Sequence, residues 1–195
     1  MNVVVMASGR GSNARALFEA ERDGRLGGAK IAGLISDNPE AYALEEARSF
    51  GKPAVCVPPE KSGARYPAQA SAKCAELIRQ WGASLVALAG FMKILPPEFV
   101  DAFAGKIINL HPSLLPAYKG KDAIKRAFEA GEKQCGCTVH FVNNELDGGE
   151  IIAQKVVEIE PGCTLEKLEE KVHEAEHALL VGVVARIASG ENAGK

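Results

Sequence analysis

The chain has 195 residues, 47% of them apolar and 25% charged, and a formal net charge of −2. This length suits one compact domain, and the charge lacks the basic excess expected of a protein that binds nucleic acid or an anionic membrane. The longest uncharged apolar stretches, such as 84–92, reach about half the roughly 20 residues of a transmembrane helix. We therefore expect one domain over residues 1–195, a small-molecule partner, no nucleic acid and no membrane.

The compartment and the metal content are predicted from the cysteines and the first residues. Five scattered cysteines, an odd number, do not form a disulfide framework and favour a reducing compartment. The chain begins with an apolar run and a glycine loop, without the features of a secretion signal, so we expect the cytoplasm. Cys135 and Cys137 form an isolated C-x-C pair, which is weak evidence of a metal site, and we expect no metal.

The first half of the chain, about 1–100, alternates two patterns. Apolar, β-branched runs predict strands over 2–6, 30–36, 54–57 and 84–89, and helical spacing predicts helices near 13–22, 42–50 and 67–81. Because these strands are apolar throughout, we expect helices to cover both of their faces. The alternation predicts an α/β fold with a Rossmann-like, mostly parallel sheet.

The second half, about 101–195, extends this sheet. We expect a strand over 106–110, a helix near 122–130, and strands over 135–142 and 151–158, which a turn containing Gly148 and Gly149 would let pair as an antiparallel extension. A helix over 164–187 closes the chain, and the apolar residues of one of its faces should dock on the domain. These residues are Leu165, Leu168, Val172, Ala175 and Leu179.

A glycine-rich loop, Ser-Gly-Arg-Gly-Ser-Asn at 8–13, follows the first predicted strand and opens the first helix. Backbone N–H groups and the helix dipole make an anion site at such a place, and Ser12 and Asn13 would add side-chain donors. The loop is neither a Walker loop nor a complete G-x-G-x-x-G motif. Two interpretations stay open, a phosphate-binding loop and a tight turn that needs glycine.

Two further stretches carry reactive side chains. Asn109 and His111 are two residues apart at the end of a predicted strand, so they share one face at the edge where open α/β sheets bind ligands. The alternative is a buried histidine beside a Pro-rich turn. Asp147 is either functional or an ordinary turn aspartate. His140 and His177 have packing explanations, and we assign neither a role.

Four blocks of sequence, taken in order, resemble a known family. The chain resembles the glycinamide ribonucleotide formyltransferases, which are folate-dependent formyltransferases, over almost its whole length. The blocks are Ser8-Gly9-Arg10-Gly11-Ser12-Asn13, Ala89-Gly90-Phe91-Met92-Lys93-Ile94-Leu95, Asn109-Leu110-His111-Pro112-Ser113-Leu114-Leu115-Pro116, and Thr138-Val139-His140-Phe141-Val142 running into Asp147-Gly148-Gly149.

The resemblance implies a reaction and a catalytic trio. The family transfers a formyl group from its co-substrate, 10-formyltetrahydrofolate, to the amine of glycinamide ribonucleotide, giving formylglycinamide ribonucleotide and tetrahydrofolate in de novo purine synthesis. The trio would be Asn109, His111 and Asp147, acting without a metal or a covalent intermediate. The amine attacks directly, Asn109 and protonated His111 stabilise the tetrahedral intermediate, and Asp147 favours the His111 cation and aids proton transfer.

The resemblance also implies where each substrate binds. Gly11, Ser12 and Asn13 would hold the ribonucleotide phosphate, while His173 and Glu176 would lie near its ribose. Two departures from the family stand at these sites: Lys93 replaces a common arginine, and His173 replaces the more usual lysine or glutamine. The folate slot would be lined by Arg65, Met92, Lys93, Ile94, Leu95, Asn109, Asn143, Asn144, Glu145, Leu146 and Asp147.

Other functions share parts of this pattern. Methionyl-tRNA formyltransferases and formyltetrahydrofolate deformylases have the same Asn, His and Asp arrangement, but the former carry a further carboxyl-terminal domain and the latter a preceding one. We expect neither domain in this chain. A non-catalytic nucleotide-binding module would not need an oxyanion donor beside a proton carrier. The sequence predicts no particular oligomeric state.

Overall fold

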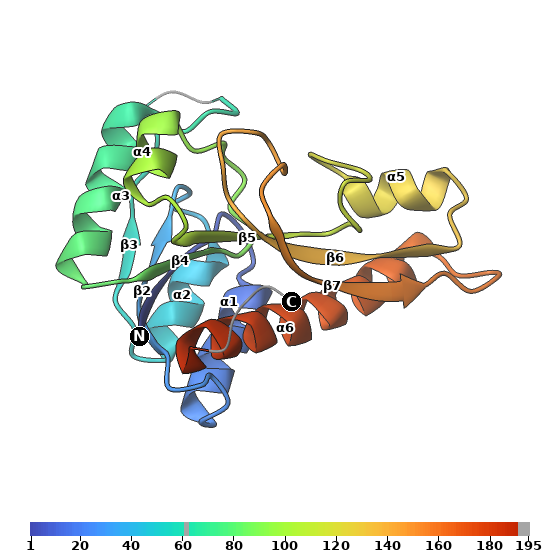
Figure 1. Ribbon diagram of the computed structural model, residues 1–195, viewed down its shortest axis with the longest axis horizontal. Coiled ribbons are helices and arrows are strands. Elements are labelled where there is room, and N and C mark those ends of the chain that lie inside the picture. Colours follow the sequence, from blue (N-terminus) through green and yellow to red (C-terminus); the bar gives the residue numbers. More distant parts are fainter. Residues whose placement is uncertain (61–62, 191–195) are drawn as a thin grey trace.

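The computed structural model describes residues 1–60 and 63–190. Within these residues, one seven-stranded sheet has the order β3-β2-β1-β4-β5-β6-β7, with helices packed around it (Figure 1). The strands are β1 (Asn2–Met6), β2 (Lys30–Ser36), β3 (Ala54–Cys56), β4 (Leu85–Leu88), β5 (Ile107–His111), β6 (Gln134–Phe141) and β7 (Ile151–Glu158). The helices are α1 (Ser12–Arg22), α2 (Tyr42–Ser49), α3 (Ala68–Gln80), α4 (Pro97–Ala102), α5 (Ala123–Glu129) and α6 (Leu165–Ser189).

The sheet is mostly parallel. Strands β1 to β5 pair in parallel, whereas β6 runs antiparallel to β5, and β7 antiparallel to β6. The predicted α/β class with an antiparallel carboxyl-terminal extension is therefore confirmed. None of the helices in the described ranges is long and apolar enough to cross a membrane. That residues 1–195 form one domain stays a prediction.

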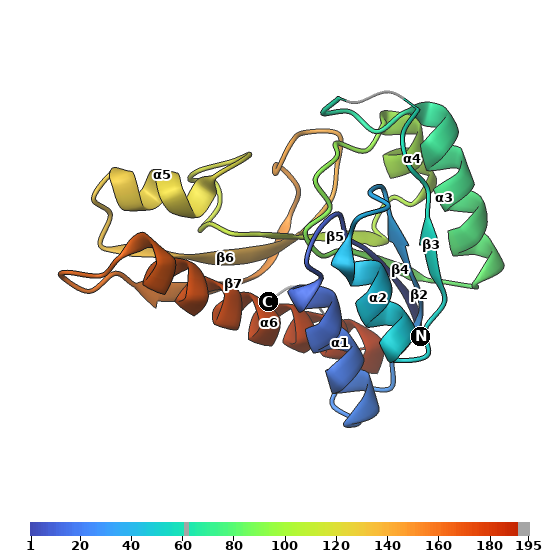
Figure 2. The ribbon, with the colours of Figure 1, turned by 180° about the vertical axis from the view of Figure 1, so that it is seen from behind.

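Helices cover both faces of the sheet, as the apolar strands predict. In β1, Val3 and Val5 pack in a buried cluster with side chains of α1, α2 and α6, whereas Val4 and Met6 pack with α3 and α4. The rear view in Figure 2 shows α1, α2 and α6 on one side of the sheet and α3 with α4 on the other. Every residue of β1 after the first is thus buried.

Most predicted elements agree with the structure to within two residues, but α4 was not predicted. It has six residues, too few to show a helical period, and Pro97 stands within its first turn, where proline is tolerated. On α6 the predicted face is correct at Leu168 and Val172, but Leu165 and Leu179 are only partly buried. Burial of α6 extends to later residues, which are Leu180, Val183 and Val184.

The strand register brings three loops to one edge of the sheet. Met6 at the end of β1 pairs with Leu88 at the end of β4, and Leu88 pairs with Asn109 on β5. Strand β1 has β2 on one side and β4 on the other, so the strand order reverses here. Open α/β sheets bind ligands at the carboxyl ends of the strands beside such a reversal. This carboxyl edge is therefore the first place to look for a site.

Candidate active site

Asn109, His111 and Asp147 come together at the carboxyl edge. Asp147, from the loop between β6 and β7, reaches both residues of β5. Its Oδ1 lies 3.5 Å from Asn109 Nδ2, and its Oδ2 lies 3.5 Å from His111 Nδ1. The side chains of His111 and Asp147 are nearly buried. An amide, an imidazole and a carboxylate thus converge in a small, mostly dry space.

The loop around Asp147 aims its carboxylate into the site. The Gly120 N–H donates a hydrogen bond of 2.8 Å to Asp147 Oδ2. Asp147 has a φ of 48°, in the left-handed region that aspartate tolerates better than most residues. Two residues later, a Cβ on Gly149 would lie 1.7 Å from the Phe141 carbonyl oxygen, so glycine is required there. The conformation of this turn therefore positions the Asp147 carboxylate beside Asn109 and His111.

His111 has a hydrogen-bond acceptor near each of its ring nitrogens. Its Nε2 lies 3.0 Å from the Tyr118 carbonyl oxygen, and its Nδ1 faces the Asp147 carboxylate. Both neighbours accept hydrogen bonds, so each can take an N–H of the ring. Because the contact between Nδ1 and Asp147 is long, at 3.5 Å, an N–H at Nδ1 can turn to a developing oxyanion instead.

His140 is a site residue to which the sequence assigned no role. It pairs with Asn109 across β5 and β6, and its Nε2 lies 3.2 Å from Asn109 Nδ2 and 3.8 Å from Asp147 Oδ1. Burial lowers the pKa of the ring, and this effect exceeds the opposing effects of the Phe141 carbonyl and the Asp147 charge. The register between the two strands, which the sequence does not reveal, is what brings His140 here.

The glycine-rich loop opens α1 as predicted. Gly11 precedes the helix with a φ of 80°, and a Cβ there would lie 2.6 Å from Ala43 Cα, so the loop needs glycine for conformation and for space. Ser12 is exposed and Asn13 half-buried in the first turn. No side chain of the described residues caps this turn, which leaves its N–H groups available to an anion.

Asn13, His173 and Glu176 form one cluster where α1 packs on α6. Asn13 Nδ2 donates to Glu176 Oε2 at 3.2 Å, and His173 Nδ1 lies 2.9 Å from the same oxygen. The hydrogen bond to Glu176 raises the pKa of His173. Glu176 is buried, and Asn13 Oδ1 is buried without a hydrogen-bond partner among the described residues. The cluster therefore offers acceptors to a ligand with hydroxyl groups.

The segment from Met92 to Leu95 follows β4 along the carboxyl edge. Ile94 forms an isolated β-bridge with Arg65, so these two predicted residues are neighbours. Lys93 Nζ donates a hydrogen bond of 2.7 Å to a backbone carbonyl of the segment that contains Arg65. Leu95 is buried, whereas Met92 is 64% exposed. The segment thus presents one large apolar side chain on an anchored backbone.

The predicted folate loop, residues 143–147, is fixed by polar contacts. Asn143 Oδ1 accepts a hydrogen bond of 3.0 Å from the Glu145 N–H, and Glu145 pairs with Lys119 at 2.7 Å. Asn144 Nδ2 donates to Asp101 on α4 at 3.0 Å. Because α4 directly follows the segment from Met92 to Leu95, this bond links the two segments predicted to bind folate. Leu146 is 52% exposed.

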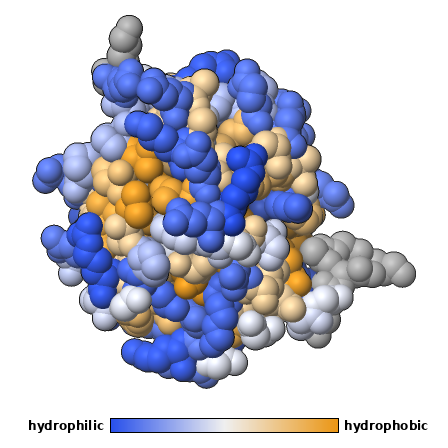
Figure 3. Space-filling model, turned by 90° about the vertical axis from the view of Figure 1, so that its left-hand side faces the viewer, coloured by the Kyte–Doolittle hydropathy of each residue, from blue (hydrophilic) through white to orange (hydrophobic). Residues whose placement is uncertain are grey.

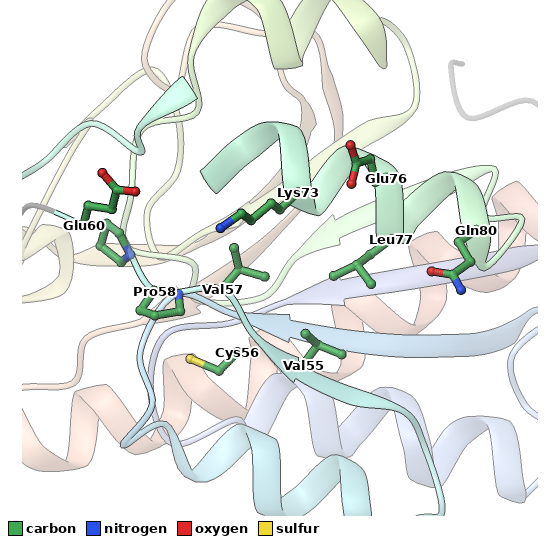
Figure 4. Close-up of a pocket in the computed structure, with 10 residues that line it drawn as sticks. Val55, Cys56, Val57, Pro58, Glu60, Lys73, Glu76, Leu77 and Gln80 are labelled. Carbon is green, nitrogen blue, oxygen red and sulfur yellow. The ribbon is translucent and has the colours of Figure 1, made fainter. Parts of the chain in front are cut away.

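One hollow lies away from these residues. It has a volume of about 550 Å³ between β3 and α3, is lined by Val55, Cys56, Lys73 and Leu77 among others, and contains none of the predicted site residues (Figure 4). Another hollow, of about 470 Å³, reaches the carboxyl edge at Met92 and Lys93. We assign the site to the carboxyl edge, because the amide, imidazole and carboxylate side chains of Asn109, His111 and Asp147 meet there.

One face of the surface is mixed in character, and the cysteines of the described residues form no disulfide. On the face shown in Figure 3, apolar areas lie between charged and polar side chains. All five cysteines are free, and Cys135 and Cys137 are buried. Within residues 1–60 and 63–190, no group of three or more His, Cys, Asp or Glu side chains could hold a metal ion.

An amide, an imidazole and a carboxylate that meet at the carboxyl edge of an open α/β sheet are groups able to stabilise an oxyanion and to transfer a proton. The chain belongs to the formyl transferase family, which matches residues 1–184. The family resemblance seen in the sequence is thereby confirmed.

Individual relatives are similar over nearly their full length. The phosphoribosylglycinamide formyltransferase of Bacillus subtilis is 39% identical over 193 residues, covering 98% of this chain and 96% of the relative. The enzyme of the same name from Escherichia coli is 36% identical, covering 97% of this chain and 88% of the relative. The crystal structure of phosphoribosylglycinamide formyltransferase from Bacillus halodurans has a TM-score of 0.90 at 34% identity, covering 98% and 97%.

The chain is also similar to one part of a longer protein. It is 40% identical over 189 residues to the trifunctional purine biosynthetic protein of Chironomus tentans, and the match covers 96% of this chain but 14% of that protein. The same fold therefore occurs as a segment of a larger polypeptide.

Proposed function

We propose that this protein transfers the formyl group of 10-formyltetrahydrofolate to the amine of glycinamide ribonucleotide, which is the phosphoribosylglycinamide of the relatives' names. The observation that carries the proposal is the convergence of Asn109, His111 and Asp147, with separations of 3.5 Å, at the edge where strand order reverses. The fold, the trio and the family membership all agree with this reaction.

The first turn of α1 and the cluster on α6 support binding of the ribonucleotide. Gly11, Ser12 and Asn13 offer backbone and side-chain donors to the phosphate at a helix N-terminus. Glu176 offers a buried carboxylate, which accepts hydrogen bonds strongly, to the ribose hydroxyls. His173, held against Glu176, adds positive charge near the phosphate when it is protonated. Together these groups would fix one end of the ribonucleotide and direct its amine to the trio.

The exposed apolar side chains support binding of the folate. Met92 and Leu146 are two of the large hydrophobic residues that remain exposed, and they belong to the two segments that the sequence predicts for folate. A flat ring system that covered them would remove apolar surface from water. Arg65 and Lys93 lie beside Ile94 and would supply positive charge to an anionic tail. The polar residues of the slot, Asn143, Asn144 and Glu145, would complete its wall.

The trio supplies stabilisation where charge develops. When the neutral amine attacks the formyl carbon, negative charge gathers on the formyl oxygen, and Asn109 with the His111 cation would donate hydrogen bonds to it. The Asn109 contact with Asp147 is long, at 3.5 Å, so this N–H can turn to the substrate at little cost. The formed carbon–nitrogen bond replaces the bond to the folate nitrogen, which breaks.

Asp147 would carry the proton that moves from one nitrogen to the other during the reaction. The attacking amine gains a bond and must lose a proton, and the leaving folate nitrogen must gain one. The Asp147 carboxylate lies near both Asn109 and His111. It would pass this proton, through water, from the attacking amine to the leaving folate nitrogen. Its negative charge would also stabilise positive charge on His111 during the reaction. Proximity of the two bound substrates supplies a further part of the rate.

Two observations support a place of action. The relatives include proteins named for purine biosynthesis, and all five cysteines of this chain are free, as expected in a reducing compartment. We infer that the protein acts in the cytoplasm, in purine synthesis.

The direct test is to incubate the protein with both substrates and to detect the products by mass spectrometry. The proposal predicts formylglycinamide ribonucleotide and tetrahydrofolate in equal amounts. A parallel reaction without the ribonucleotide separates transfer from hydrolysis. If formate accumulated at the same rate in both reactions and no formylated ribonucleotide formed, the protein would be a hydrolase, and the proposal would be wrong.

A further inference from the structure

Ser8 connects, through hydrogen bonds, the segment predicted to bind the ribonucleotide and the segment predicted to bind folate. It follows β1 and begins the glycine-rich loop, yet it makes two hydrogen bonds to the segment that follows β4. Its backbone N–H donates to the Gly90 carbonyl at 3.0 Å, and its Oγ accepts from the Met92 N–H at 2.8 Å. The start of the loop predicted to hold phosphate is thus bonded to the start of the segment predicted to hold folate.

Asp37 contacts Ser8 at the place where the two segments are bonded. It follows β2, and its Oδ1 accepts a short hydrogen bond from the Ser8 hydroxyl. Asp37 is 6% exposed, and none of the ion pairs of the described residues includes it. Burial of a carboxylate without a cation costs folding free energy. Packing therefore does not explain why an aspartate occupies this position.

Met92, Ser8 and Asp37 are joined by two consecutive hydrogen bonds, which we call the relay. The Met92 N–H donates to Ser8 Oγ, and the Ser8 O–H donates to Asp37. A hydroxyl that donates to a charged carboxylate becomes a stronger acceptor, so the charge of Asp37 strengthens the bond to Met92. Ser8, Asp37 and Met92 also border the hollow of about 470 Å³, so open space adjoins this junction.

We propose that Asp37 is a positioning residue that acts through Ser8 to hold the segment from Met92 to Leu95 in register with the glycine-rich loop. The inference rests on the proposed function, because these two segments would bind the two substrates. Loss of the relay would leave the ribonucleotide bound but would weaken the binding of folate and misalign the formyl carbon and the amine. A misplacement of about 1 Å can lower the rate about 100-fold.

The relay can be tested without substrates. In Asp37→Ala the Ser8 hydroxyl loses its acceptor, and hydrogen exchange at the Met92 amide, followed by NMR, should be at least about 10-fold faster than in the wild type. Asp37→Asn keeps an oxygen that can accept from Ser8 but lacks the charge, so it should restore part of the protection. Glu40→Gln, a neighbouring exposed carboxylate, is the control. Unchanged exchange at Met92 in Asp37→Ala would overturn the relay.

Kinetics then test the positioning role. Asp37→Ala and Ser8→Ala should each lower kcat about 10- to 100-fold and raise the KM for folate, with little effect on the KM for the ribonucleotide. The double variant should be no worse than either single one, because both remove the same relay. Additive losses, or equal changes in both KM values, would contradict the inference. If the wild type transferred no formyl group, the proposed function would fail, while the Met92 exchange would still decide the relay.

Discussion

His140 Nε2 lies 3.2 Å from Asn109 Nδ2, directly across the β5–β6 pairing. On the other side of the ring, His140 Nδ1 lies 2.7 Å from the Phe141 carbonyl oxygen, which can only accept. The neutral ring therefore carries its proton on Nδ1 and has a lone pair on Nε2. This lone pair accepts from the Asn109 amide and so fixes which end of the amide faces the reacting groups.

Removal of the His140 ring should therefore lower activity without removing a group that contacts the substrate. In His140→Ala the Asn109 amide can turn over, and we expect kcat to fall about 10- to 100-fold with little change in the KM for the ribonucleotide. Steady-state kinetics check this, with His177→Ala as the control outside the cluster. Equal kcat values in the two variants would show that His140 does not orient Asn109.

The depressed pKa of His140 should also make stability depend on pH. Its pKa in the folded protein lies below the ordinary value of 6.5. As the pH falls, the ring is therefore protonated in the unfolded chain before it is protonated in the folded protein. The contribution of the neutral ring to the free energy of unfolding is complete above about pH 6.5, and it is lost as the pH falls through the folded pKa. His140→Gln should reduce this loss, by at most about 1.4 kcal/mol per pH unit.

Urea unfolding at several pH values measures this effect. His177 has a pKa lowered by burial in the same direction, whereas Glu176 raises that of His173. The contribution of His173 therefore has the opposite sign, being present at low pH and lost as the pH rises through its folded pKa. If wild type and His140→Gln lost stability equally between about pH 7.5 and 5.5, the buried neutral ring would be refuted.

Glu176 should control affinity for the ribonucleotide alone. Glu176→Gln removes the charge from a buried oxygen that Asn13 and His173 both contact. A hydrogen bond to a charged group contributes about 1.5–3 kcal/mol, so we expect the KM for the ribonucleotide to rise about 10- to 100-fold and the KM for folate to stay the same. Glu174→Gln, on the exposed face of α6, is the matched control. A rise in both KM values would contradict this division of the site.

Gly149 should be irreplaceable because of space. In Gly149→Ala the new Cβ would lie 1.7 Å from the Phe141 carbonyl oxygen, and the loop that carries Asp147 would have to move. We expect a loss of about 1–3 kcal/mol in the free energy of unfolding, together with loss of activity. Gly182→Ala, which meets no atom within 4 Å, should instead stabilise α6 by about 0.5–1 kcal/mol. Denaturation curves that rank the two variants in the reverse order would contradict this.

The sequence predicts the parts of the fold that depend on local pattern. The bounds of β1, β2 and β7 agree with the structure because apolar runs and their limits are local signals. The shared face of Asn109 and His111 follows from strand periodicity. Helix α4 has too few residues to carry a period, and Pro96 and Pro97 at its start indicate a turn.

The contacts that build the site could not be predicted in this way. The role of His140 depends on the register between β5 and β6, and the reach of Asp147 depends on a bond from Gly120, 27 residues earlier. The bond from Ser8 to Asp37 likewise joins two strand ends that are brought together only by the sheet order. The resemblance supplied the trio, but not its neighbours.

The central claim is that His111 stabilises the charge formed during transfer of the formyl group from folate to the ribonucleotide. Its most direct test is kcat for this reaction in the wild type and in His111→Ala, with equal far-ultraviolet circular dichroism spectra as evidence of an intact fold. The account predicts turnover by the wild type and a loss of about 100- to 1,000-fold in kcat for the variant. A His111→Ala protein that kept the wild-type kcat would contradict it.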